Sequence, residues 1–163
     1  MIYHDNGRKL VLALKHGDRH EVLKPAARWL AAAVKPILPD SGVLIAPVPL
    51  HWLRLLRRTF NQSAMLAQSL GKMIDQEVCP DLLIRPKRTQ SLGGLSLDQR
   101  FAEMEESITL NPRRADLLQG RTVLIVDDVM TSGATLSASA QACLTGGAKD
   151  VMTLTLARVV KDA

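Results

Sequence analysis

The chain has 163 residues, of which 47% are hydrophobic, and a formal net charge of +5. This length suits one domain with a substantial core and is too short for two ordinary domains. Aromatic residues make up only 3% of the chain, which leaves few stacking platforms for a binder of single-stranded nucleic acid. The positive charge therefore favours a small polyanion as the ligand, with nucleic acid as the alternative partner.

The sequence also bears on location and metal content. No apolar run approaches the roughly 20 residues of a membrane span, and the start, M-I-Y-H-D-N-G, lacks the pattern of a secretory signal. Cys79 and Cys143 are far apart and have no metal-ligand spacing. We therefore expect packed, reduced thiols, a cytoplasmic protein, no membrane contact and no zinc in this chain.

The first predicted elements are helices. Lys9–Lys15 is short and apolar, and Gly17 follows as a stop signal. Val22–Val34 predicts a longer helix with Pro25 in its first turn. A turn rich in proline and glycine follows. We expect residues 1–40 to form a helical N-terminal part in front of an α/β core of residues 41–163.

The core begins with a buried strand, predicted at Val43–Val48, that runs into Pro49. Three basic residues follow it: Arg54, Arg57 and Arg58. Ligands of parallel α/β sheets bind at the carboxyl ends of the strands, so these arginines are candidates for anion binding. The alternative is the solvated basic start of a helix.

The middle of the chain contains a helix, expected at Ser63–Ile74 with Asn61 or Ser63 as its cap. Leu82–Ile84 is expected to be the third strand. The polar segment behind it contains three more basic residues and a glycine pair: Arg85, Lys87, Arg88 and Gly93-Gly94. Paired glycines would let this loop move as a lid, and surface disorder is the alternative. A short helix and a short strand are expected next, at Leu97–Met104 and Ile108–Leu110.

The stretch Thr122–Leu136 reads T-V-L-I-V-D-D-V-M-T-S-G-A-T-L. Its apolar run, Val123–Val126, predicts a central parallel strand buried on both faces. Two carboxylates follow where that strand should end. A loop of small hydroxylated residues then leads into a helix that stops at Gly146-Gly147. The last core strand is predicted at Val151–Val159.

This order of strand, acidic pair, loop and helix predicts a phosphate cradle. Backbone amides at the helix start, with nearby hydroxyl groups, can hold a phosphate dianion at the positive end of the helix dipole. Asp127 and Asp128 would repel that anion directly. We therefore expect them one sugar-length away, where they accept hydrogen bonds from sugar hydroxyls or lie near a metal ion.

The stretch resembles the 5-phosphoribosyl-1-pyrophosphate (PRPP) signature of type I phosphoribosyltransferases, in which two acidic residues precede a T-T-G-x-T-like loop. Ser132 stands at the second threonine and keeps its donor. From about Tyr3 to Arg158 the chain resembles the ComF (GntX-like) family. That resemblance rests on four blocks, which include A-P-V-P-L-H-W-x-R-L-x-R-R-T-F-N-Q-S, R-x-x-x-T-x-S-x-G-G-L-S-x-x-x-R and V-D-D-V-M-T-S-G-A-T-L.

The chain departs from the family pattern in three respects. Family members usually carry a four-cysteine zinc ribbon before the tyrosine, and this chain starts without one. Thr59 stands where the family has a glycine. Leu92 and Glu103 stand where glutamine and asparagine are usual, in the block expected to cover the ligand. These last two changes make transferase turnover less certain than ligand binding.

The resemblance implies an α/β fold of type I phosphoribosyltransferase-like architecture: a parallel twisted sheet flanked by helices, with a small N-terminal helical hood, in one domain of residues 1–163. It implies Mg²⁺-dependent transfer from PRPP to an unidentified acceptor, linked to competence, DNA uptake or nucleotide metabolism. One alternative is a non-catalytic module that binds PRPP or a nucleotide and regulates a DNA-processing protein. Another is direct binding of nucleic acid. We also expect a homodimer.

The expected PRPP site comprises the acidic pair and the loop behind it: Asp127, Asp128, Met130, Thr131, Ser132, Gly133, Ala134 and Thr135. Asp127 and Asp128 are also the catalytic candidates and indirect metal ligands, and Asp128 is the candidate general base. Pyrophosphate is expected at the turn after the first strand and at four arginines: Val48, Pro49, Arg54, Arg57, Arg58 and Arg88.

Overall fold

The computed structural model describes residues 1–2, 5–15, 20–50, 60–86, 96 and 107–160. Its helices are α1 (Asp5–Lys15), α2 (Leu23–Val34), α4 (Gln62–Ile74) and α6 (Ala134–Thr145). Its 3-10 helices are η1 (His20–Val22), η2 (Lys35–Ile37) and η3 (Pro112–Leu118). Its strands are β1 (Leu44–Pro47), β2 (Glu77–Val78), β3 (Leu83–Ile84), β4 (Thr109–Leu110), β5 (Thr122–Met130) and β6 (Asp150–Arg158).

Four strands form a parallel sheet in the order β2-β1-β5-β6. In the register, Pro47 lies opposite Val126, and Val126 lies opposite Leu154. All of β1 and the first five residues of β5 are buried, as the unbroken apolar runs predicted. The predicted parallel sheet flanked by helices is therefore confirmed.

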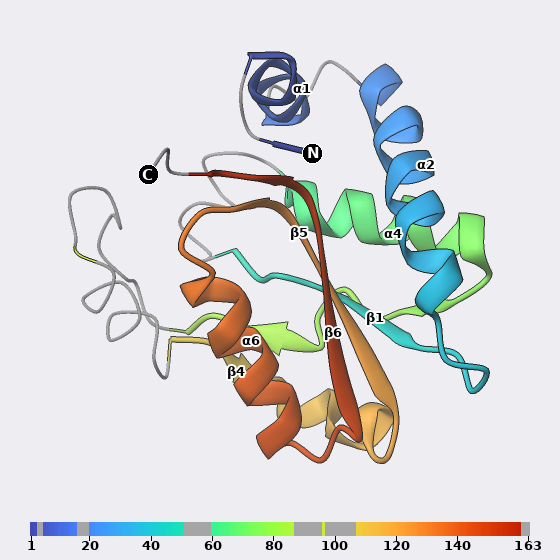
Figure 1. Ribbon diagram of the computed structural model, residues 1–163. Helices are drawn as coiled ribbons and strands as arrows, with labels where there is room; N and C mark the ends of the chain where they lie inside the picture. Colours follow the sequence, from blue (N-terminus) through green and yellow to red (C-terminus); the bar gives the residue numbers. More distant parts are fainter. Residues whose placement is uncertain (3–4, 16–19, 51–59, 87–95, 97–106, 161–163) are drawn as a thin grey trace.

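Helices cover both faces of this sheet (Figure 1). Successive side chains of a strand point to opposite faces, so β5 contributes to two cores. Leu124 and Val126 pack with apolar residues of α1, α2 and α4. Val123 and Ile125 pack on the other face with residues of α6, η3 and the segment around β3. The central strand thus connects two apolar layers.

The N-terminal helices belong to the first of these layers. Val11 and Leu14 of α1 are buried in the same cluster as Leu30 of α2. The amino group of Met1 donates a hydrogen bond to the Leu156 carbonyl of β6 at 3.0 Å. The predicted short helix is confirmed and begins at Asp5 rather than at Lys9. In the described part of the chain, no helix combines the length and apolar character that crossing a bilayer requires.

Both cysteines are free and buried, as predicted. Burial raises the pKa of Cys143 to about 12. Burial is also the main cause that raises the pKa of Cys79, and the charge of Asp81 adds to it. Both thiols therefore stay protonated at neutral pH and behave as packing groups.

The predicted strand at Leu82–Ile84 is confirmed as β3, but it does not join the parallel sheet. Leu83–Ile84 pairs antiparallel with Thr109–Leu110 in a separate two-stranded sheet. The place beside β1 is taken by Glu77–Val78, which the sequence analysis missed. A two-residue strand that contains a glutamate has no apolar run by which it could be found. The expected strand at Ile108–Leu110 is confirmed as β4, and the expected helix at Leu97–Met104 lies outside the described residues.

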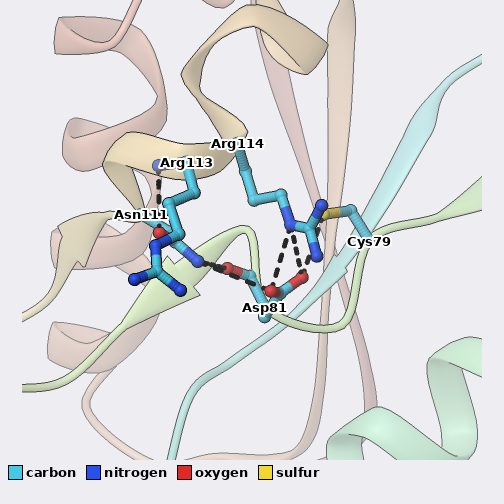
Figure 2. Close-up of polar contacts among 5 residues, drawn as sticks. All are labelled: Cys79, Asp81, Asn111, Arg113 and Arg114. Carbon is cyan, nitrogen blue, oxygen red and sulfur yellow. Dashed lines mark hydrogen bonds and ion pairs between the residues drawn. The ribbon is translucent and has the colours of Figure 1, made fainter.

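The small sheet is tied to η3 by a cluster of polar side chains (Figure 2). Arg114 Nε donates to both carboxylate oxygens of Asp81 at 3.0 Å. Asn111 Nδ2 donates to the Asp81 carbonyl at 2.9 Å, and Asn111 Oδ1 accepts from the Arg113 amide at 3.1 Å. Cys79 Sγ donates to Asp81 Oδ1 at 3.6 Å. Asn111 therefore both caps η3 and holds the segment before β3.

Replacement of Asn111 by alanine should lower the free energy of unfolding by about 1–2 kcal/mol, because the cap and the bond to Asp81 are lost together. Urea denaturation measures the change. Arg113→Ala is the control, because this neighbour takes part in the cluster through its backbone amide. Equal stability of the two variants would contradict the role assigned to Asn111.

Candidate functional site

The candidate site lies at the carboxyl edge of the parallel sheet, where β1 and β5 end. The Val48 amide donates to the Val126 carbonyl at 2.9 Å, which continues the ladder between the two strands past the end of β1. The next residues of β5 are the acidic pair, Asp127 and Asp128. The turn after β1 and the two carboxylates are therefore neighbours, as the expected ligand geometry requires.

The strand does not end before the acidic pair, which corrects the sequence prediction. β5 continues to Met130, because β6 runs beside it over its whole length. Asp127 pairs with Thr155 and Val129 pairs with Ala157. Main-chain pairing thus extends the strand through residues that have low strand propensity.

Asp127 is held in one orientation by two hydrogen bonds to the same oxygen. Asp127 Oδ1 accepts from Ser63 Oγ and from the Asp128 amide, each at 2.9 Å. Burial, followed by the charge of Asp128, raises the pKa of Asp127 to about 7 from 3.8. The bond from Ser63 acts in the opposite direction and favours the ionised form. Burial and the neighbouring charge thus favour the protonated form of this carboxyl group.

The loop behind the acidic pair is formed by Thr131, Ser132 and Gly133. Gly133 is the N-cap residue of α6 and has a φ of 85°, a left-handed conformation that favours glycine. The Ala134 amide donates to Ser132 Oγ at 3.4 Å, a long hydrogen bond that a phosphate oxygen could replace. The first turn of a twelve-residue helix thus presents its amides at the loop.

The hydroxyl groups of this loop are accessible to different degrees. Thr131 is exposed, whereas Ser132 and Thr135 are half-buried. Met130 is half-buried, and Ala134 is buried in the core below the loop. The three hydroxyls and the first amides of the helix lie within the same five consecutive residues, 131–135.

The turn expected to hold pyrophosphate is anchored from α4. Val48 and Pro49 are buried, and the Val48 carbonyl accepts a hydrogen bond from Asn61 Nδ2 at 3.0 Å. Asn61 Oδ1 caps α4 by accepting from the amides of Ser63 and Ala64, at 3.0 and 3.3 Å. Of the two predicted caps, Asn61 is the one observed. The four arginines of this prediction lie outside the described residues: Arg54, Arg57, Arg58 and Arg88.

The acidic pair fits a magnesium ion that arrives with a phosphorylated substrate. The described residues contain no group of three or more His, Cys, Asp and Glu side chains that could hold a metal. Mg²⁺ usually keeps several waters and binds one or two carboxylates together with substrate phosphates. Asp127 and Asp128 are two adjacent carboxylates, so they suit a magnesium ion that substrate phosphates also bind.

Two features of α4 were missed by sequence reasoning. Ser63 was considered only as a helix cap, whereas its hydroxyl group binds Asp127. Gln62 is buried, and among the described residues its side-chain nitrogen has no hydrogen-bond partner. A buried donor of this kind costs about 1–3 kcal/mol unless water or a ligand completes it. The Asn-Gln-Ser run after the first strand was the available signal for both.

Comparison with known proteins defines the class. Residues 87–162 match the family model described as phosphoribosyl transferase domain. A hypoxanthine phosphoribosyltransferase from Staphylococcus aureus superposes with a TM-score of 0.53 at 19% identity, covering 82% of this chain and 61% of that chain. Phosphoribosylpyrophosphate synthetase from Mycobacterium smegmatis superposes with a TM-score of 0.53 at 14% identity, covering 84% of this chain and 34% of that chain. The chain therefore has the type I phosphoribosyltransferase fold.

Curated relatives narrow the class further. Competence protein F from Haemophilus influenzae is 30% identical over 91% of this chain, which spans 66% of that protein. DNA utilization protein YhgH from Escherichia coli K12 is 32% identical over 93% of this chain and 66% of its own length. Competence protein ComFC from Bacillus subtilis is 24% identical over 96% of this chain and 61% of its own length. The chain is thus a homologue of the ComF and YhgH proteins, and the resemblance found in its motifs is confirmed.

Proposed function

We propose that this chain binds PRPP at the carboxyl edge of its sheet and transfers the phosphoribosyl group to an acceptor. The observation that carries the proposal is the continuity of the acidic pair with the loop before α6. Gly133 lies five residues after Asp128, and the helix amides begin at the next residue, Ala134. A ribose 5-phosphate spans these two features with its diol and its phosphate.

Each part of the site has a distinct task in this reaction. The bond between C1 of the ribose and the pyrophosphate oxygen breaks, the acceptor forms a new bond to C1, and the acceptor proton passes to a base or to water. Asp127 and Asp128 hold the ribose hydroxyls, and the amides of α6 hold the 5-phosphate. The turn at Val48 and Pro49 holds the leaving pyrophosphate. Bound Mg²⁺ would neutralise charge on that leaving group.

This chemistry depends on positioning and on charge neutralisation, and it needs no nucleophilic side chain. Asp128 is the candidate base, because it follows Asp127 directly and would lie beside the ribose that the pair holds. The competence and DNA-utilization names of the relatives favour an acceptor or a partner connected with DNA. We therefore place the activity in nucleotide metabolism or DNA uptake.

A second candidate function is PRPP or nucleotide binding without transfer, which would regulate a DNA-processing protein. The observation that favours it is in the sequence: Leu92 and Glu103 replace the glutamine and asparagine usual in the ComF block that would cover the ligand. Both residues lie outside the described part of the chain. The two functions share the binding site and differ in turnover.

Calorimetry with PRPP and Mg²⁺ is the first test, and we expect a dissociation constant between about 1 μM and 1 mM. Single-stranded DNA at the same concentration is the comparison ligand. Binding of DNA with no binding of PRPP would overturn the proposal in favour of a nucleic-acid binder. Where PRPP binds, release of pyrophosphate with a panel of bases indicates transfer, and its absence with every base favours the regulatory module.

A further inference from the structure

A closed ring of hydrogen bonds connects the first strand, the start of α4 and the acidic pair. The Val48 amide donates to the Val126 carbonyl at 2.9 Å, and Asn61 Nδ2 donates to the Val48 carbonyl at 3.0 Å. Asn61 Oδ1 accepts from the Ser63 amide at 3.0 Å. Ser63 Oγ closes the ring by donating to Asp127 Oδ1 at 2.9 Å. Asp127 follows Val126 directly, so every member of the ring is covalently or hydrogen-bonded to the next.

Ser63 occupies a rigid position in this ring. It is the second residue of α4 and is only 5% exposed. The cap from Asn61 fixes the backbone at this point, and the buried residues Leu66, Ala67 and Leu70 fix the helix against the sheet. A short serine side chain on a fixed backbone has little freedom, so the position of its hydroxyl group is set by the fold.

The bond from Ser63 decides how the carboxylate of Asp127 faces a ligand. Both the Ser63 hydroxyl and the Asp128 amide donate to Oδ1. Oδ2 takes neither of these two bonds, and we expect this oxygen to accept from a sugar hydroxyl. A carboxylate anchored through one oxygen presents the other at a defined angle, whereas an unanchored carboxylate rotates about its last torsion.

We propose that Ser63 is a positioning residue for the ribose diol: it orients Asp127 for the sugar and does not itself contact the ligand. This inference rests on the proposed function, because it assigns the sugar to Asp127. It also separates two parts of the ligand. Ser63 governs recognition of the ribose, while Asn61 supports the turn that receives pyrophosphate.

The variant Ser63→Ala tests this role with three ligands: PRPP, ribose 5-phosphate and inorganic pyrophosphate. We expect about a tenfold loss of affinity for PRPP and for ribose 5-phosphate, the effect of weakening one hydrogen bond to a charged group. Affinity for pyrophosphate should stay within about twofold of wild type. The matched control is Ser69→Ala, which makes the same change on the same helix about 9 Å further along.

The outcomes separate this inference from the proposed function. Wild-type protein that binds neither PRPP nor ribose 5-phosphate overturns both. If the wild type binds and Ser63→Ala loses affinity equally for all three ligands, or for none of them, only the role of Ser63 is overturned. Thermal unfolding of both serine variants checks that the protein is folded at the titration temperature. A tenfold loss that is confined to the two ribose ligands supports the assignment.

Discussion

The double variant Asp127→Asn/Asp128→Asn should lose PRPP affinity by at least about 100-fold. Each carboxylate is expected to accept a charge-assisted hydrogen bond from a ribose hydroxyl, and such bonds contribute about 1.5–3 kcal/mol apiece. The pair also supplies the negative charge that a magnesium–pyrophosphate complex requires. Isothermal calorimetry with PRPP and Mg²⁺ measures the loss.

The control must make the same change of charge elsewhere. Asp116 lies in η3 and Asp150 begins β6, beside the amino end of β5. Asp116→Asn/Asp150→Asn therefore raises the net charge equally at a distance from the acidic pair. PRPP affinity that survives in the first double variant would rule out the diol site, and with it both the transferase and the regulatory function.

The unfolding free energy of the ligand-free protein should fall as pH rises from about 4 to 7, through the contribution of Asp127. Its pKa is about 7 in the folded protein against 3.8 for the ordinary group. Between these values the folded state keeps a proton that the unfolded state has lost, so the stabilising contribution is full below pH 3.8 and is lost as pH rises towards 7. Asp127→Asn removes this dependence.

Urea denaturation of wild type and Asp127→Asn at pH 5 and pH 8 measures the effect. From pH 5 to pH 8, the free energy of unfolding of wild type should fall by about 2 kcal/mol relative to that of the variant. One pKa unit corresponds to about 1.36 kcal/mol, and the partial exposure of the side chain reduces the full effect. PRPP affinity of the wild type should rise over the same range, because the ionised carboxylate is the better acceptor. A pH-independent difference between the two proteins would show that Asp127 titrates normally.

The main elements of the fold were predictable because they carry long apolar patterns. The strands at β1, β5 and β6 and the helices α2, α4 and α6 all appeared at their expected places, within a few residues. β2 was not predictable, since its two residues carry no apolar pattern and are a strand only through their pairing with β1. The end of β5 was misplaced for a related reason: pairing with β6, and not residue type, extends that strand to Met130.

The candidate site shows the same division. The acidic pair, the glycine and the hydroxyl residues could be assigned from their order in the chain, because they are contiguous. The bond from Ser63 to Asp127 joins residues that are 64 positions apart, and it depends on how α4 packs on the sheet. Asn61 was a candidate cap from its residue type, but its second bond to the Val48 carbonyl required the tertiary structure.

The left-handed backbone of Gly133 has a consequence for which side chains this loop admits. A Cβ atom built there would meet nothing closer than the sulfur of Met130, at 3.9 Å. Space is therefore available, and the restriction is one of handedness: an L-residue would bear about 1–2 kcal/mol of torsional strain at this φ. A D-alanine introduced by chemical ligation would have the opposite preference and would fit without that strain. Stereochemistry, and not crowding, selects the achiral residue at the entrance to α6.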